Sequence, residues 1–223
     1  MVRRRCTIIF ACNVDIFGVL TMNAIKWKSA LYIILGLTTL VSVTNWFISG
    51  QQFTVKFVID CFSKSVTLIT IVVGLFCSHL WKLKWFQKWL VLIPNLNGKW
   101  TGYICSNWIN KETGENIPPI FTTLTIKQSL FKTSCFIQTG ESKSHSILSS
   151  FWIDEDNQIL KLTYTYRNEP DLNIQDRSRM HYGTVILDIN IRNGGYVLEG
   201  SYWTSRNTCG QLAFSCQEKP RKK

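Results

Sequence analysis

Two long apolar runs near the N-terminus constrain the fold of this chain more than any other feature. The first, 30–48, reads ALYIILGLTTLVSVTNWFI and has no charged residue; in the second, 57–80, the only charged residues are Asp60 and Lys64. A membrane-spanning helix needs about 20 mostly apolar residues, because roughly 30 Å of hydrocarbon is crossed at 1.5 Å per residue. The sequence therefore predicts two transmembrane helices within 29–81, joined by a short polar turn into a hairpin.

The charges around these runs predict the orientation of the hairpin. The chain carries 25 Lys/Arg and 14 Asp/Glu, yet ten of the basic residues and only two of the acidic ones lie before residue 94. The excess positive charge therefore belongs to the membrane flanks rather than to a nucleic-acid surface, and we expect no DNA or RNA partner. By the positive-inside rule both ends of the chain face the cytoplasm. The flanking bases are Arg3, Arg4, Arg5, Lys26 and Lys28 before the hairpin and Lys82, Lys84 and Lys88 after it, whereas the loop offers Lys56 alone.

The segments that flank the hairpin have weaker patterns. Residues 1–28 combine an Arg-rich start with a short apolar stretch, and Met22 stands directly before a basic flank. Two interpretations stay open: a physiological start at Met22, or a third membrane-associated segment. Residues 82–94 interleave Trp and Lys, with the Trp residues at a spacing of four, which predicts a helix at the membrane interface. Residues 218–223 form a basic tail.

From residue 95 to residue 217 the apolar period changes to two, which predicts a separate β domain. The candidate strands carry no helical segment between them, and Asn193-Gly194 is a strong hairpin signal. Such a pattern is typical of a barrel or a sandwich. We favour a small eight-stranded antiparallel up-and-down (lipocalin-like) β-barrel, because closure removes exposed strand edges. The predicted strands are 99–108, 119–128, 131–139, 145–153, 158–167, 181–192, 195–205 and 208–217.

The alternation of faces groups side chains that suit a nucleotide. Tyr202 and Thr204 share a face, and Arg206 continues it by parity. An aromatic ring, a hydroxyl and a guanidinium match the base and the phosphate of a nucleotide. The common alternative is that inward aromatic residues fill a core and that an Arg at a strand end is solvated. Further candidates on inward faces are Trp100, Tyr164, Tyr166 and His181.

Nothing in the sequence selects a catalytic or metal site. No GxSxG elbow, phosphate loop, HExxH or CxxC pair is present. We therefore expect no enzyme activity, no metal and no cofactor. The eight cysteines are expected to be free thiols, because the β domain is placed in a reducing compartment.

Charged residues inside the second apolar run have two interpretations. Lys56, Asp60 and Lys64 recur at a spacing of four and so share one helical face. One interpretation is a neutralised pair near the outer interface, with Lys64 extending its amine outward. The other is a polar membrane seam for helix association or a water-lined path, since charges within a membrane often mark function.

Three stretches after the basic-flanked hairpin resemble a known family. They read PNLNGKWTGYI (94–104), HYGTVILDI (181–189) and LEGSYWTSRNTCGQLAF (198–214). Together they resemble the two-transmembrane β-barrel effectors of CBASS, bacterial anti-phage systems that signal with cyclic oligonucleotides. The resemblance covers nearly the whole chain from Met22 onward.

The resemblance implies a receptor that acts at the bacterial inner membrane. A partner CD-NTase-type cyclase would make a cyclic dinucleotide, which the cytoplasmic barrel would bind. The chains would then form a homo-oligomer, and the hairpins would disrupt the membrane and kill the infected cell. For this ligand, strand parity favours Tyr202 and Tyr166 for base stacking, Arg206 for phosphate and Thr204 for a polar contact. Second choices are Trp100, Tyr164 and His181.

Three other functions fit the same architecture. A membrane-tethered lipocalin-like carrier of an apolar ligand would have an all-apolar cavity. A structural membrane protein would have a filled barrel. A membrane enzyme would bring an acid, a base and a nucleophile together in space.

Overall fold

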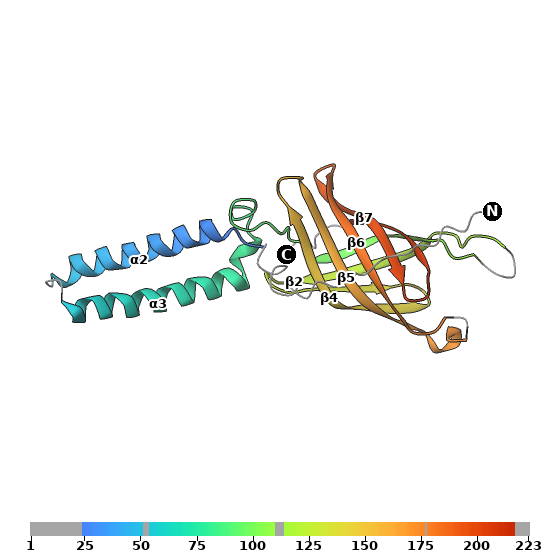
Figure 1. Cartoon of the computed structure of the whole chain (residues 1–223), viewed down its shortest axis with the longest axis horizontal. Coiled ribbons are helices and arrows are strands. Elements are labelled where there is room, and N and C mark those ends of the chain that lie inside the picture. Colours follow the sequence, from blue (N-terminus) through green and yellow to red (C-terminus); the bar gives the residue numbers. More distant parts are fainter. Residues whose placement is uncertain (1–23, 51–53, 110–113, 177, 217–223) are drawn as a thin grey trace, which may run out of the picture.

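Two apolar helices followed by a closed β-barrel make up the protein (Figure 1). The computed structural model describes residues 24–50, 54–109, 114–176 and 178–216. The segment before Met22 and the basic tail 218–223 lie outside the described residues.

The helices α2 (Trp27–Ser49) and α3 (Val55–Ser78) form the predicted hairpin. Gly50 ends α2 in the left-handed conformation, with a φ of 56°, and its N–H donates to the Trp46 carbonyl. Thr54 caps the start of α3 by accepting a hydrogen bond from the Phe57 N–H (3.3 Å). Both helices are long and apolar enough to cross a membrane, and little of either is buried within the chain. A core helix of a soluble domain would be mostly buried, so this exposure favours membrane association.

Eight antiparallel strands, each paired with its neighbours in sequence, close into a barrel when β8 pairs with β1. This topology confirms the predicted up-and-down barrel over the sandwich. Asn193 and Gly194 both have positive φ in the β6–β7 hairpin, as the sequence indicated. The strands are β1 (Gly98–Ser106), β2 (Ile120–Gln128), β3 (Thr133–Gln138), β4 (Ser142–Asp154), β5 (Ile159–Pro170), β6 (His181–Arg192), β7 (Gly195–Thr204) and β8 (Cys209–Cys216).

The barrel has two unlike ends. The chain enters β1 from α3, so β1 begins at the end that faces the helices, called the helix end here (Figure 1). Because the strands alternate in direction, the β1–β2, β3–β4, β5–β6 and β7–β8 connections lie at the opposite end, called the far end. Between the two ends the interior is filled with apolar side chains, among them Leu124, Leu162, Leu187, Leu198 and Phe214.

The segment between α3 and β1 corrects the prediction of a helix over 82–94. A short 3-10 turn, η1 (Leu80–Lys82), is followed by turns, and Val91 forms isolated bridges with Ile25 and Gln87. The reason is burial, because the apolar side chains of this segment cover the helix end of the barrel and pack into its core instead of lying on a membrane surface. These side chains are Trp81, Leu90, Val91, Ile93 and Leu96. An ion pair of 2.6 Å from Lys26 to Glu155 of the β4–β5 connection adds a polar link at the same end.

Close approach of neighbouring strands requires glycine inside the barrel wall. A Cβ built on Gly200 of β7 would overlap the backbone carbonyl of Ile186 in the paired strand β6. Backbone atoms cannot rotate away as a flexible side chain would, so any larger residue must push the two strands apart.

We expect Gly200→Ala to lower the free energy of unfolding of the full-length chain by about 2 kcal/mol or more, because overpacking against backbone strains the wall. Gly140→Ala is the matched control, since a Cβ there meets no atom within 4 Å; its effect should stay within about 0.5 kcal/mol. Denaturant unfolding in detergent micelles, followed by tryptophan fluorescence, measures both. Equal stabilities of the two variants would contradict the prediction.

Candidate ligand-binding site

Two tyrosine rings lie on the inner wall at the far end of the barrel. Tyr166 of β5 is paired with Gly183 of β6, and a Cβ on that glycine would come within 2.5 Å of the Tyr166 ring. Tyr202 of β7 is paired with Gly210 of β8, where an added Cβ would lie 2.6 Å from the Tyr202 ring. Gly183 and Gly210 therefore do not leave empty space, because the rings of Tyr166 and Tyr202 pack directly against their backbone.

The turn after β7 presents Arg206 beside these rings. Thr204 Oγ1 lies 2.6 Å from Thr208 Oγ1 and accepts a hydrogen bond from the Arg206 N–H (3.2 Å). The Thr204 hydroxyl therefore holds the turn that carries Arg206. The guanidinium donates to the Ser178 hydroxyl (3.2 Å) and is exposed. Within the described ranges no carboxylate lies at ion-pair distance from it, so its charge is free to meet an anion.

His181 and Asn168 extend this cluster across β5 and β6. They are paired in register, and both are buried. His181 Nδ1 lies 3.1 Å from the Arg179 carbonyl oxygen, and Asn168 Oδ1 accepts a hydrogen bond from the Ser144 hydroxyl (2.7 Å). Burial lowers the pKa of His181, and the nearby Arg206 charge lowers it further. The imidazole is therefore neutral at pH 7 and can both donate and accept a hydrogen bond.

The tyrosine hydroxyls are kept protonated by their surroundings. Burial is the main cause that raises the pKa of both Tyr166 and Tyr202, while the Arg206 charge acts in the opposite direction on each. A hydrogen bond with the Ser106 side chain also lowers the pKa of Tyr202. Both rings thus offer a neutral π face and an O–H donor next to a cation.

The structure brings most, but not all, of the predicted site residues together. Those at the far end are Tyr166, His181, Tyr202, Thr204 and Arg206. Tyr164 lies one level deeper, with its ring centroid 6.3 Å from that of Tyr166. Trp100 lies near the start of β1, at the helix end; its indole N–H donates to the Leu96 carbonyl (3.0 Å), and only 2% of its surface is exposed. Trp100 therefore belongs to the core beneath the juxtamembrane cover.

Sequence reasoning missed two polar residues of the far end, Asn168 and Ser178. Asn168 is the next inward position after Tyr164 and Tyr166, but the predicted strand ended at residue 167, whereas β5 continues to Pro170. Parity would have found Asn168 had the strand been extended. Ser178 lies in the β5–β6 connection, outside any strand, so no periodic pattern could have placed it next to Arg206.

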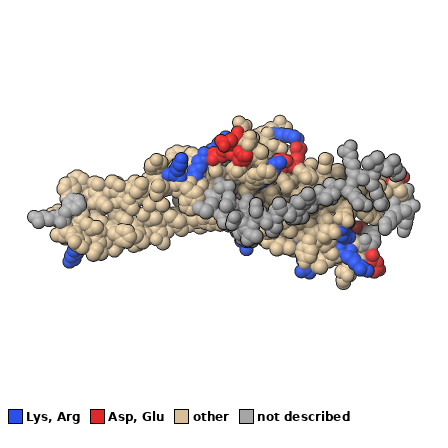
Figure 2. All heavy atoms as spheres, in the orientation of Figure 1, with Lys and Arg blue, Asp and Glu red and all other residues tan. Residues whose placement is uncertain are grey.

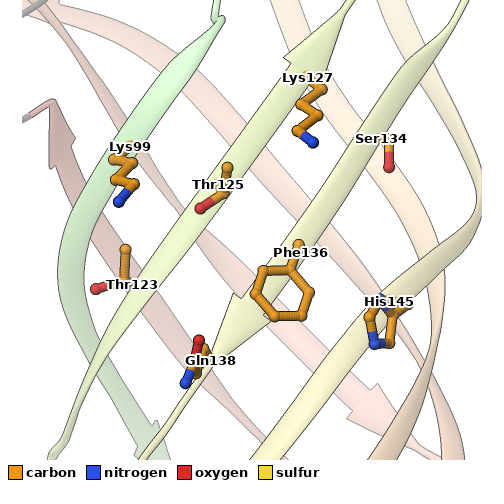
Figure 3. A pocket seen from close by; sticks show the side chains of 8 residues that line it. All are labelled: Lys99, Thr123, Thr125, Lys127, Ser134, Phe136, Gln138 and His145. Carbon is orange, nitrogen blue, oxygen red and sulfur yellow. The ribbon is translucent and has the colours of Figure 1, made fainter. Parts of the chain in front are cut away.

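A hollow of about 630 Å³ lies on the outer face of the barrel (Figure 3). One transverse row of paired residues crosses it, with Lys99 on β1, Thr125 on β2, Phe136 on β3 and His145 on β4. Lys127 on β2 lies beside this row. We call this surface the outer groove. The sequence analysis did not consider these positions as a site.

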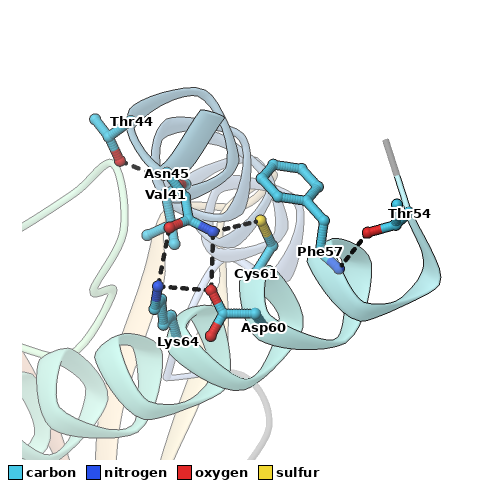
Figure 4. Close-up of polar contacts among 8 residues, drawn as sticks. All are labelled: Val41, Thr44, Asn45, Thr54, Phe57, Asp60, Cys61 and Lys64. Atoms are coloured by element: carbon cyan, nitrogen blue, oxygen red, sulfur yellow. Dashed lines mark hydrogen bonds and ion pairs between the residues drawn. The ribbon is translucent and has the colours of Figure 1, made fainter. Parts of the chain in front are cut away.

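A polar cluster joins the two helices of the hairpin (Figure 4). The Lys64 amine lies 2.6 Å from Asp60 and donates to Asn45 Oδ1 of α2 (2.9 Å). Asn45 Nδ2 in turn donates to Asp60 Oδ2 (3.1 Å). The charged pair predicted as a membrane seam is therefore neutralised within one hairpin, and Asn45, which the sequence analysis did not single out, completes it.

The described residues include no group of His, Cys, Asp or Glu side chains that could hold a metal ion. Burial raises the pKa of the Cys135 thiol to about 12, so this inner thiol is not a nucleophile at neutral pH. The far-end cluster offers two phenol rings, the imidazole of His181, the amide of Asn168 and the guanidinium of Arg206 to a ligand.

The family model described as "Cap15, cyclic dinucleotide receptor domain" matches residues 91–215, which are the barrel and the residues that lead into it. A search of the curated proteins found no match.

Tyr164 tests whether every polar group buried in the barrel has a hydrogen-bond partner. Its hydroxyl is fully buried and has no hydrogen-bond partner among the described residues. An unpartnered buried hydroxyl is unfavourable, so Tyr164→Phe should raise the free energy of unfolding by about 1 kcal/mol.

Tyr182→Phe removes the hydroxyl of an exposed tyrosine and is the matched control; we expect a change within about 0.5 kcal/mol. Denaturant unfolding of the full-length chain in micelles compares the variants. A clear loss of stability in Tyr164→Phe would mean that its hydroxyl has a partner.

Proposed function

Because the chain belongs to the Cap15 cyclic dinucleotide receptor family, we propose that the far end of its barrel binds a cyclic dinucleotide and thereby controls a CBASS effector. The observation that carries this location is the Arg206 guanidinium, which stands beside two tyrosine rings without a carboxylate partner in the described part of the chain. A phosphate would supply the missing counter-charge.

The far-end side chains match the parts of this ligand. A cyclic dinucleotide presents two bases and two phosphates. Tyr166 and Tyr202 offer rings on which bases stack, a contact that contributes about 1–3 kcal/mol per base. Neutral His181 and the buried Asn168 offer hydrogen bonds to polar base edges. Thr204 acts through the turn that positions Arg206 rather than through a free hydroxyl.

The hairpin would hold this receptor at the bacterial inner membrane with both ends of the chain in the cytoplasm. Figure 2 supports this, because Lys and Arg side chains lie where the helices meet the barrel, next to a group of acidic side chains, whereas the helix surface is almost free of charge. The basic residues next to this junction in the sequence include Lys26, Lys28, Lys82, Lys84 and Lys88. Positive flanks stay on the cytoplasmic side, where a CD-NTase-type cyclase activated by infection would supply the ligand.

The effector step would be self-association of liganded chains. A ligand shifts a population only by its differential affinity for the two states, so the cyclic dinucleotide must favour the homo-oligomer. Hairpins brought together would then exchange the Asp60–Lys64 pairing within one hairpin for pairing between hairpins. A polar path through the bilayer, loss of the membrane barrier and death of the infected cell would follow.

The far end does not suit the carrier considered above. A carrier of an apolar ligand requires an apolar cavity, whereas the far end bears Arg206, His181 and Asn168, and the interior below is filled. The matched family is a receptor domain rather than a catalytic one, and the proposal needs no reaction step.

Calorimetric titration of the full-length chain in detergent micelles with a panel of cyclic dinucleotides tests the binding site. We expect saturable binding of at least one member. Arg206→Ala should lower its affinity roughly 10- to 150-fold, because charge-assisted hydrogen bonds contribute about 1.5–3 kcal/mol. The control is Arg167→Ala, which removes an exposed guanidinium paired with Glu169. Absence of binding by the whole panel, or unchanged affinity in Arg206→Ala, would refute the assignment.

Dye release from liposomes that contain the chain tests the effector step. In Asp60→Leu/Lys64→Leu, ligand affinity should be unchanged, because both residues lie in α3, away from the barrel. Ligand-triggered release should fall to the background, since no polar seam can form. The swapped pair Asp60→Lys/Lys64→Asp keeps the charges and should retain release. Full release from the leucine variant would exclude a role for these charges.

A further inference from the structure

The outer groove combines cations, hydroxyls and rings in one transverse row. Cross-strand pairing puts Lys99 opposite Thr125, Thr125 opposite Phe136 and Phe136 opposite His145. Strands lie about 4.8 Å apart, so Lys99 on β1 and Phe136 on β3 are separated by about 10 Å across the sheet. All of these side chains point away from the barrel interior, so the groove shares no residue with the far-end cluster (Figure 3).

The charge of the groove favours an anion. Lys99 and Lys127 lie among its lining residues, and neither forms an ion pair with any described residue. The strands β1, β2 and β3 contain no Asp or Glu, so no carboxylate of these strands competes for the two amines. Unpaired lysines that face a common hollow favour a phosphate.

The opposite side of the groove offers an aromatic surface. The rings of Phe136 and His145 lie 4.9 Å apart at their centroids with an interplanar angle of 42°. Phe136 is only half-buried although it is a large apolar side chain, so part of its ring is available to a ligand. The hydroxyl of Thr125 lies between Lys99 and Phe136, and the hydroxyl of Ser134 lies on β3 opposite Lys127; both can hydrogen-bond a sugar.

We propose that the outer groove is a second ligand site, which binds a nucleoside phosphate. The phosphate lies at Lys99 and Lys127, the base packs on Phe136 and His145, and the sugar lies over β2. The volume of about 630 Å³ is within the range of small-molecule sites. The site is independent of the far-end receptor function, because its residues come from the other face of the wall.

Photolabelling of the full-length chain in micelles with 8-azidoadenosine 5′-monophosphate tests the site. Mass spectrometry should find the label on peptides that contain Phe136 or His145. Unlabelled AMP should compete for this labelling, whereas adenosine should compete poorly because it lacks the phosphate. Equal competition by adenosine and AMP would overturn the role of the lysines without any variant.

Variants then locate the phosphate. Lys99→Gln/Lys127→Gln should lower labelling about tenfold, as expected from the loss of charge-assisted contacts. Lys84→Gln/Lys132→Gln removes the same charge outside the groove and should leave labelling intact. Arg206→Ala should also leave it intact, which separates this site from the far-end receptor. Label confined to far-end peptides, no label at all, or full labelling of the Lys99/Lys127 variant would overturn the proposal.

Discussion

The apolar cover at the helix end of the barrel is the contact on which the rest of the structure depends. Trp81 and Val91 are almost fully buried, and they belong to the same core as the inward residues of the strands, such as Trp100 and Phe151. A barrel open at this end would expose that core to water or lipid. Because the cover is also the chain that leaves α3, the hairpin and the barrel are packed together without a loose linker. The self-association proposed for the barrels would therefore be transmitted directly to the helices.

The polar and charged side chains lie at the surfaces that the apolar core does not occupy. At the far end no juxtamembrane segment covers the strands, and Arg206, His181 and Asn168 gather there. On the outer wall, strands without acidic residues leave Lys99 and Lys127 unpaired by any described residue. Within the hairpin, by contrast, the charges of Asp60 and Lys64 pair with each other. Two surfaces thus present cations without a carboxylate partner in the described part of the chain, whereas Lys64 of the hairpin is paired with Asp60.

Local sequence patterns predicted most of the fold, but the pattern in 82–94 wrongly predicted a helix. The period of two located all eight strands, because one face of each strand is buried in the barrel. Tryptophans at a spacing of four in 82–94 fit an interface helix equally well on local grounds. Trp81, however, is fully buried in the core at the helix end, and Lys88 adopts a positive φ of 76° that interrupts any helix. Tertiary burial decided between two conformations that the local sequence allowed.

The sequence by itself determined the apolar helical hairpin, the eight strands and the face on which each candidate residue lies, since these follow from apolar length and strand alternation, whereas closure into a barrel required the pairing of β8 with β1. Strand parity does not show how far along the barrel axis a residue lies. The register between neighbouring strands shows this position. For this reason Trp100 and Tyr202 share an inward face yet lie at opposite ends. Only the tertiary structure showed that the Thr204 hydroxyl is used by its turn, that Asn45 joins Asp60 and Lys64, and that residues of four strands form one outer groove. These are contacts between distant parts of the chain, and packing alone decides them.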